Sequence, residues 1–191
     1  MTKILLQTFL NTKVSKDNIY NEFSLQHELG IFLRENLNNQ KVEFERNISF
    51  FDFSKDSCVK KEIDICVYDK NKNICTIELK FPRNGQYPEQ MFSFCKDIKF
   101  LEQLKSKFEK CYFLLIVDDK NFYSSQDDLS KDGIYKYFRT QNLSNIPTLT
   151  GHIEKPTKNS SSKEFTLTGN YKIVWENIPN VQDWKYCLLE I

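Results

Sequence analysis

Residues 62–80, EIDICVYDKNKNICTIELK, constrain the fold of this chain more than any other stretch. Apolar side chains alternate with polar ones on both sides of the run 69–73, which is made of turn-forming residues. Alternation with a period of two predicts β-strands, and a polar run between two such segments predicts a hairpin. A hairpin symmetric about Asn71 places Asp64 opposite Glu78 on one face of the sheet, with Cβ atoms roughly 4.5–5.5 Å apart.

Two carboxylates that face each other need a positive partner, because like charges directly opposite destabilise a sheet. Lys80 is one candidate, and a divalent cation such as Mg²⁺ is the better one because hard ions prefer oxygen ligands. Glu62 would also face Lys80, so an ordinary cross-strand ion pair beside solvated acids remains open. A slip of one residue would separate Asp64 from Glu78, so the metal site depends on the register.

The segments around the hairpin predict an alternation of helices and strands. Ser24 is the expected N-cap of a helix whose apolar stripe carries Glu28 at its margin. Loose alternation over 41–53 predicts a strand, and the stretch from about 88 to 107 predicts an amphipathic helix. The unbroken apolar run 112–117 is typical of a strand buried on both faces, which predicts a parallel βαβ unit.

The two ends of the chain are less strongly patterned. Residues 3–9 fit an edge strand or a short helix, and residues 126–139 predict a helix. The polar segment 154–164 predicts an exposed loop. Gly169-Asn170 predicts a hairpin turn between two short strands, and residues 181–191 fit a strand or a short helix.

Composition narrows the class of protein. A length of 191 residues favours one domain, and 16 Phe and nine Tyr supply a large core. The net charge of +1 predicts no binding to nucleic acid through bulk charge, so such binding would need a local basic patch. We expect no membrane segment, no signal peptide and no structural zinc site, because the six cysteines form no CxxC pair. Reduced cysteines and a cytoplasmic location are the corresponding expectations.

The spaced triad Asp64, Glu78 and Lys80 resembles the D…(D/E)xK signature of the PD-(D/E)XK nuclease superfamily, which has the restriction endonuclease-like fold. The core of that fold is αβββαβ, the order that periodicity predicts here. Members of the superfamily commonly add a Glu from the first helix, and Glu28 occupies that place. The Pro of the signature is absent, since Ile63 precedes the Asp.

The resemblance implies a single nuclease-like domain over residues 1–191. Its class is α/β (α+β), with a restriction endonuclease-like αβββαβ core and a central mixed sheet flanked by helices. The resemblance spans about 21–118, and the C-terminal extension at about 120–191 lies outside it.

The same resemblance implies metal-dependent hydrolysis of phosphodiester bonds, with DNA expected before RNA. Asp64, Glu78 and the backbone carbonyl of Leu79 would hold Mg²⁺ or Mn²⁺, with Glu28 as a further ligand, directly or through water. Lys80 would orient the attacking water or offset charge on the phosphate.

Nucleic-acid contacts are expected from Arg83, Lys96 and Lys99, and from Gln90, which resembles part of a Gln-x-x-x-Tyr element in an exonuclease branch of the superfamily. A homodimer is a further expectation, since many restriction-type nucleases are dimers. Two alternatives stay open. One is a catalytically inactive module of the same fold that binds nucleic acid or protein. The other is an unrelated α/β protein whose charges are structural.

Overall fold

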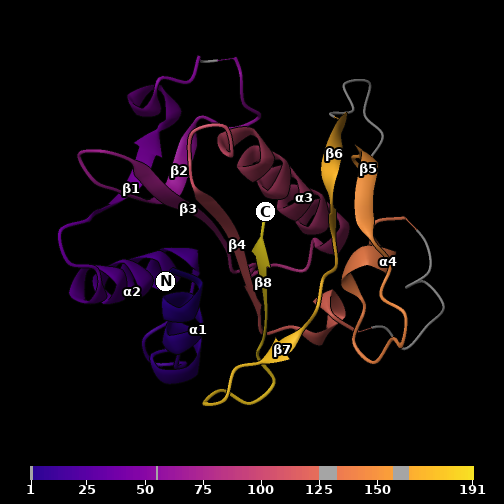
Figure 1. The fold of residues 1–191 in the computed structure, drawn as a ribbon. Helices are drawn as coiled ribbons and strands as arrows, with labels where there is room; N and C mark the ends of the chain where they lie inside the picture. Colours follow the sequence, from indigo (N-terminus) through magenta and orange to yellow (C-terminus); the bar gives the residue numbers. More distant parts are fainter. Residues whose placement is uncertain (1, 55, 125–132, 157–163) are drawn as a thin grey trace.

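The computed structural model describes residues 2–54, 56–124, 133–156 and 164–191. It has a six-stranded mixed sheet in the order β1-β2-β3-β4-β8-β7 and a separate pair of strands, β5-β6 (Figure 1). The helices are α1 (Thr2–Thr12), α2 (Glu22–Asn36), α3 (Tyr87–Leu104) and α4 (Tyr135–Phe138), with 3₁₀ helices η1 (Ile48–Phe51) and η2 (Lys120–Phe122). The strands are β1 (Lys41–Asn47), β2 (Glu62–Tyr68), β3 (Asn73–Lys80), β4 (Lys110–Val117), β5 (Leu149–Glu154), β6 (Glu164–Tyr171), β7 (Glu176–Asn177) and β8 (Lys185–Glu190).

The predicted hairpin is present as β2 and β3. The two strands are antiparallel, and Cys66 lies opposite Thr76, which is the predicted register. Tyr68 pairs with Asn73 instead of the residue after it, because an irregularity shifts the register next to the turn. The register is therefore confirmed along the strands and wrong only beside the turn.

The predicted βαβ unit is also present. Strands β3 and β4 are parallel and are connected by α3. Every residue of β4 except Lys110 is buried, as the unbroken apolar run predicts for a strand covered on both faces. Strand β8 then pairs with the other edge of β4 in an antiparallel direction.

Helices cover both faces of the sheet. Helices α1 and α2 lie on one face, and α3 lies on the other together with the β5-β6 pair (Figure 1). Neighbouring side chains on a strand point to opposite faces, so Ile77 and Leu79 pack with Leu29 of α2. Glu78, which lies between them in β3, points toward α3.

Helix α2 begins earlier than predicted. Its N-cap is Asn21, whose side-chain oxygen accepts a hydrogen bond from the backbone N–H of Ser24 at 2.8 Å. The hydroxyl of Ser24 accepts from the backbone N–H of Asn21 at 3.0 Å, which completes a capping box. Ser24 therefore belongs to the first turn, and this correction brings Glu22 into the helix.

Other predicted boundaries are partly right. Residues 3–9 lie in a helix, and the strand predicted over 41–53 ends at Asn47, where η1 begins. Only the end of the helix predicted over 126–139 lies within the described residues, as α4. Most of the loop predicted over 154–164 lies outside them. None of the helices in the described ranges combines the length and apolar character needed to cross a membrane.

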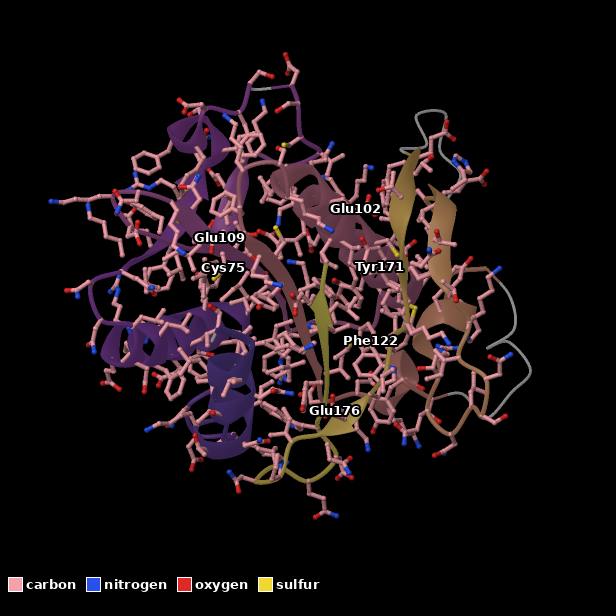
Figure 2. The ribbon with its side chains drawn as sticks, viewed as in Figure 1. Cys75, Glu102, Glu109, Phe122, Tyr171 and Glu176 are labelled. Atoms are coloured by element: carbon pink, nitrogen blue, oxygen red, sulfur yellow. The ribbon has the colours of Figure 1, made fainter. Side chains whose placement is uncertain are left out.

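The hairpin turn predicted at Gly169-Asn170 is wrong. Both residues lie inside β6, which pairs with β5. A side chain at Gly169 would overlap the ring of Tyr171, which folds back toward Glu102 on α3. Figure 2 shows Glu102 and Tyr171 where β6 passes this helix, and the Tyr171 hydroxyl donates to Glu102 at 3.0 Å. The glycine makes room for this contact, so here it does not mark a turn.

Candidate active site

The carboxylates of Asp64 and Glu78 are brought together across β2 and β3. The backbone N–H of Asp64 donates to Oε1 of Glu78 at 3.2 Å. The backbone N–H of Leu79 donates to Oδ2 of Asp64 at 2.8 Å. Glu78 is fully buried, and the Asp64 side chain is only 14% exposed. Each acid is thus held by the main chain of the opposite strand, which fixes its position before any ligand binds.

Lys60, whose place the sequence pattern does not predict, lies among these acids. The Nζ atom of Lys60 contacts Oε2 of Glu78 and lies 2.9 Å from Oδ1 of Asp97. It lies 3.7 Å from Oδ1 of Asp64. Asp97 comes from α3 and is buried. One ammonium group therefore faces three carboxylates in the space between the sheet and α3.

The predicted Lys80 lies beside the same group. Its Nζ atom lies 3.0 Å from Oε1 of Glu22 and 3.4 Å from Oδ2 of Asp97. It also donates to the backbone carbonyl of Leu79 at 3.0 Å. The second oxygen of Glu22 accepts from the backbone N–H of Phe81 at 3.2 Å. The first turn of α2 thus holds the end of β3 through its acidic side chain.

Two other predicted neighbours lie elsewhere. Glu28 is 37% exposed and lies 3.5 Å from Nδ1 of His27. Successive helix residues are rotated by about 100°, so the face that carries Glu22 and Gln26 is turned away from Glu28. Glu62 is exposed at the start of β2, and the ion pairs of Lys80 within the described residues are with Glu22 and Asp97, not with Glu62 as in the alternative of an ordinary cross-strand pair. The helix side chain that contacts the cluster is Glu22, and no contact between Glu28 and the cluster is found among the described residues, so its role as a metal ligand stays a prediction.

These side chains form a largely buried ionic cluster with an imbalance of charge, and Glu22 is its most exposed member, at 41%. It contains four carboxylates and two ammonium groups, so two carboxylate charges have no cation to match them within the cluster. Oδ2 of Asp97 is buried and accepts no hydrogen bond from the described residues. Buried charge without a full partner is costly. The ionic cluster consists of Glu22, Lys60, Asp64, Glu78, Lys80 and Asp97.

The surroundings shift the acidities of the cluster. Burial raises the pKa of Asp64 to about 6 from an ordinary value of 3.8, although the charges of Lys60 and Lys80 act in the opposite direction. Burial, and next the charge of Asp64, raise the pKa of Glu78 well above its usual range. Burial alone would lower the pKa of Lys60, but Glu78 and the other acids more than offset this and raise it. The two lysines stay charged while the two central acids favour a proton or a metal ion.

A small cavity opens beside Asp64, between α2 and the sheet. Its volume is about 30 Å³, which is room for little more than one water molecule or ion. The side-chain amide of Gln26 donates to Oε1 of Glu45 at 2.6 Å and to the carbonyl oxygen of Asp64 at 2.8 Å. The cavity is lined by Glu22, Phe23, Gln26, Glu45, Asp64 and Leu79.

Two other features could attract a ligand. In the described residues, one group of three potential metal ligands has all its ligand atoms within 4.8 Å of one another, namely His152, Glu154 and Glu164 on the β5-β6 pair. All three are exposed, so water already solvates their charges. A hollow of about 910 Å³ lies near Tyr123 and Trp184, and none of the predicted site residues lines it. The charged side chains of the ionic cluster are, in contrast, mostly buried, with Glu22 the exception at 41% exposed.

The side chains expected to contact nucleic acid are mostly engaged within the protein. Arg83 and Lys99 form ion pairs with acidic neighbours, Asp118 and Glu102. The amide of Gln90 donates to a neighbouring Asn side chain at 2.9 Å. Lys96 is partly exposed on α3.

Three members of the ionic cluster were not anticipated. Helical spacing does indicate that Asp97 is buried, because Asp97 lies three residues after Phe94 and so falls on the apolar side of α3. Glu22 lies outside the helix that the sequence predicts, because Ser24 is the expected N-cap, whereas the N-cap is Asn21. Lys60 lies in an irregular segment, where no periodicity shows which way a side chain points.

Comparisons of the chain with protein-family models, with curated proteins and with solved structures found no match. Its function is therefore inferred from the geometry and charge of the ionic cluster.

Proposed function

We propose that this chain is a metal-dependent nuclease that hydrolyses phosphodiester bonds, with DNA as its substrate, at the ionic cluster. One observation carries the proposal. The cluster places Asp64 and Glu78 side by side in a largely buried setting where carboxylates outnumber lysines by two, with Glu22 the one partly exposed acid. A single divalent cation supplies that missing charge, and carboxylate oxygens are the ligands that Mg²⁺ and Mn²⁺ prefer.

The residues present fit such an ion. Asp64 and Glu78 would hold it, because both are pre-positioned by backbone N–H groups and their raised pKa values reflect buried negative charge in need of a partner. The carbonyl of Leu79 faces the same cluster, where it accepts from Lys80. A bound divalent ion supplies a water of lowered pKa and neutralises charge on the phosphate.

Lys80 would act on the water or on the phosphate oxygens. Glu22 and Asp97 hold its ammonium group, and the charges around it raise its pKa, so it carries a full positive charge at neutral pH. A fixed positive charge beside a transferring phosphoryl group stabilises the transition state more than the ground state. Glu22 is thereby a positioning residue, since it acts through Lys80.

The direct test is cleavage of supercoiled plasmid, linear duplex, single-stranded DNA and RNA in Mg²⁺ or Mn²⁺, with EDTA as the blank. Asp64→Asn and Glu78→Gln keep the size of each side chain and remove its charge, so both should lose activity. Glu109→Gln is the matched control, because Glu109 is an exposed acid in an ion pair with Lys72. If the two cluster variants cleave as fast as the control, the ionic cluster is not the active site.

A non-catalytic module with the same architecture is the alternative, and the contact of Lys60 with Glu78 favours it, because the lysine already neutralises one acid. Thermal unfolding in Mn²⁺ separates the two. An ion that binds only the folded chain must raise the melting temperature. If millimolar Mn²⁺ does not raise the melting temperature and no nucleic acid is cleaved, the chain is a non-catalytic module.

A further inference from the structure

We infer that Lys60 serves as the second cation of the ionic cluster, so that the site takes one divalent ion where a pair of ions would otherwise be needed. This inference rests on the proposed function and specifies how that site is charged. Two-metal nuclease and phosphatase sites place their ions about 3.5–4 Å apart between shared carboxylates. Here an ammonium group lies between the acids that a second ion would share.

The contacts of Lys60 are unequal, and this shows which acids it serves. Its Nζ atom contacts Glu78 and lies 2.9 Å from Asp97, but it lies 3.7 Å from Asp64. Lys60 therefore bridges the strand acid and the helix acid and leaves Asp64 the least neutralised by it. A divalent ion at Asp64 can share Glu78 with the lysine, whereas an ion between Glu78 and Asp97 would have to take the place of the ammonium group.

The lysine is held in position from outside the cluster. The backbone N–H of Val59 donates to the side chain of Gln103 on α3 at 2.9 Å. The Gln103 amide donates in turn to the carbonyl of Ser57 at 3.2 Å. The Nζ atom of Lys60 also lies 5.5 Å from the centre of the Phe100 ring, within the range of a cation–π contact. The segment before β2 is thus fastened to the helix that carries Asp97.

The charges of the cluster favour the same stoichiometry. With Lys60 and Lys80 charged, one divalent ion neutralises the four carboxylates. A second ion would leave an excess of positive charge between the sheet and α3, where uncompensated charge is costly. Without Lys60, Glu78 and Asp97 would lack their shared cation, and a second divalent ion could bind there.

Mn²⁺ binding by the full chain, without nucleic acid, tests this inference. Calorimetry should give one Mn²⁺ per chain for the natural sequence and two for Lys60→Gln. Electron paramagnetic resonance of Lys60→Gln should show two coupled Mn²⁺ ions, which requires that they lie close together. Lys99→Gln is the matched control, because Lys99 also pairs with a carboxylate on α3, at 3.1 Å, outside the cluster. It should bind one ion.

Removal of Asp97 completes the test. The double variant Lys60→Gln/Asp97→Asn should return to one ion, since the acid that recruits the second ion is gone. If Lys60→Gln does not fold, Gln103→Ala provides the same information, because it releases the segment that holds the lysine and should permit a second, weaker Mn²⁺ site.

Each outcome separates this inference from the proposed function. If the natural chain and Lys60→Gln both bind one ion, the role of Lys60 is overturned but the proposed nuclease site is not. Gln103→Ala is read in the same way where Lys60→Gln does not fold. Two ions in the natural chain also overturn it. If the natural chain binds no Mn²⁺ at millimolar concentration, both the proposed metal site and the role of Lys60 are contradicted.

Discussion

Replacing Asp64 by asparagine should make the metal-free chain more stable at neutral pH. The pKa of Asp64 is raised to about 6, against an ordinary value of 3.8, chiefly by burial. The folded chain therefore resists ionisation of this group, and the rise in its pKa corresponds to ~3 kcal/mol of folding free energy at neutral pH. An asparagine keeps the oxygen that accepts from the backbone N–H of Leu79 and carries no charge to desolvate.

The effect should depend on pH in a definite direction. Between pH 3.8 and about 6 the folded chain binds more protons at Asp64 than the unfolded chain does, so this group makes stability fall as the pH rises. Below about pH 3 the side chain is neutral in both states, and the variant gains little. Above about pH 7 the full ~3 kcal/mol applies, which is roughly 6–12 °C in melting temperature for a chain of this size.

The assay is thermal or urea unfolding in EDTA at pH 4.5 and pH 7.5, with Glu109→Gln as the control. That exposed acid should change stability by less than about 1 kcal/mol at either pH. Mn²⁺ at 100 times its Kd should then stabilise only the natural chain, by about 2.7 kcal/mol, and close most of the gap. The reasoning is refuted if Asp64→Asn is the less stable protein at pH 7.5 in EDTA, or if the gap is equal at both pH values.

Three further results are expected. Glu22→Gln should slow Mg²⁺-dependent cleavage about tenfold through its contact with the site lysine, whereas Glu28→Gln should not change it, and equal rates would contradict this assignment. Mn²⁺ affinity, measured by calorimetry, should fall by at least about tenfold per pH unit below pH 6, because Asp64, and also Glu78 with its raised pKa, must release a proton before it binds metal. Gly30→Ala should destabilise the chain by about 1–3 kcal/mol, because a Cβ there overlaps the ring of Phe44; an unchanged melting temperature would show that the ring moves freely.

The parts of the fold that could be predicted from the sequence depend on short-range periodicity. The register of β2 with β3 follows from alternation on both sides of one turn, and β4 follows from an unbroken apolar run. These signals are local, so a single sequence contains them. The opposition of Asp64 and Glu78 followed from the register alone and brought two acids of the candidate site together before any tertiary contact was known.

The rest of the site depends on contacts between distant segments. Asp97 and Lys60 meet only because α3 packs on the sheet beside the start of β2. Glu22 reaches the cluster because the capping box begins α2 three residues earlier than predicted and so places Glu22 in its first turn, beside the end of β3. At Gly169 the sequence pattern of a turn was outweighed by the packing of Tyr171 against α3.

The position of β8 has a consequence for the order in which the chain is assembled. Strand β4 is buried on both faces, and β8, made some 70 residues later, covers the edge that it does not share with β3. A ribosome that has released only β1 to β4 therefore exposes a long apolar edge ready to pair with another chain. Synthesis at 5–20 residues per second leaves that edge open for several seconds. The nascent protein is thus most vulnerable to aggregation after the predicted catalytic acids have been made and before the sheet is complete.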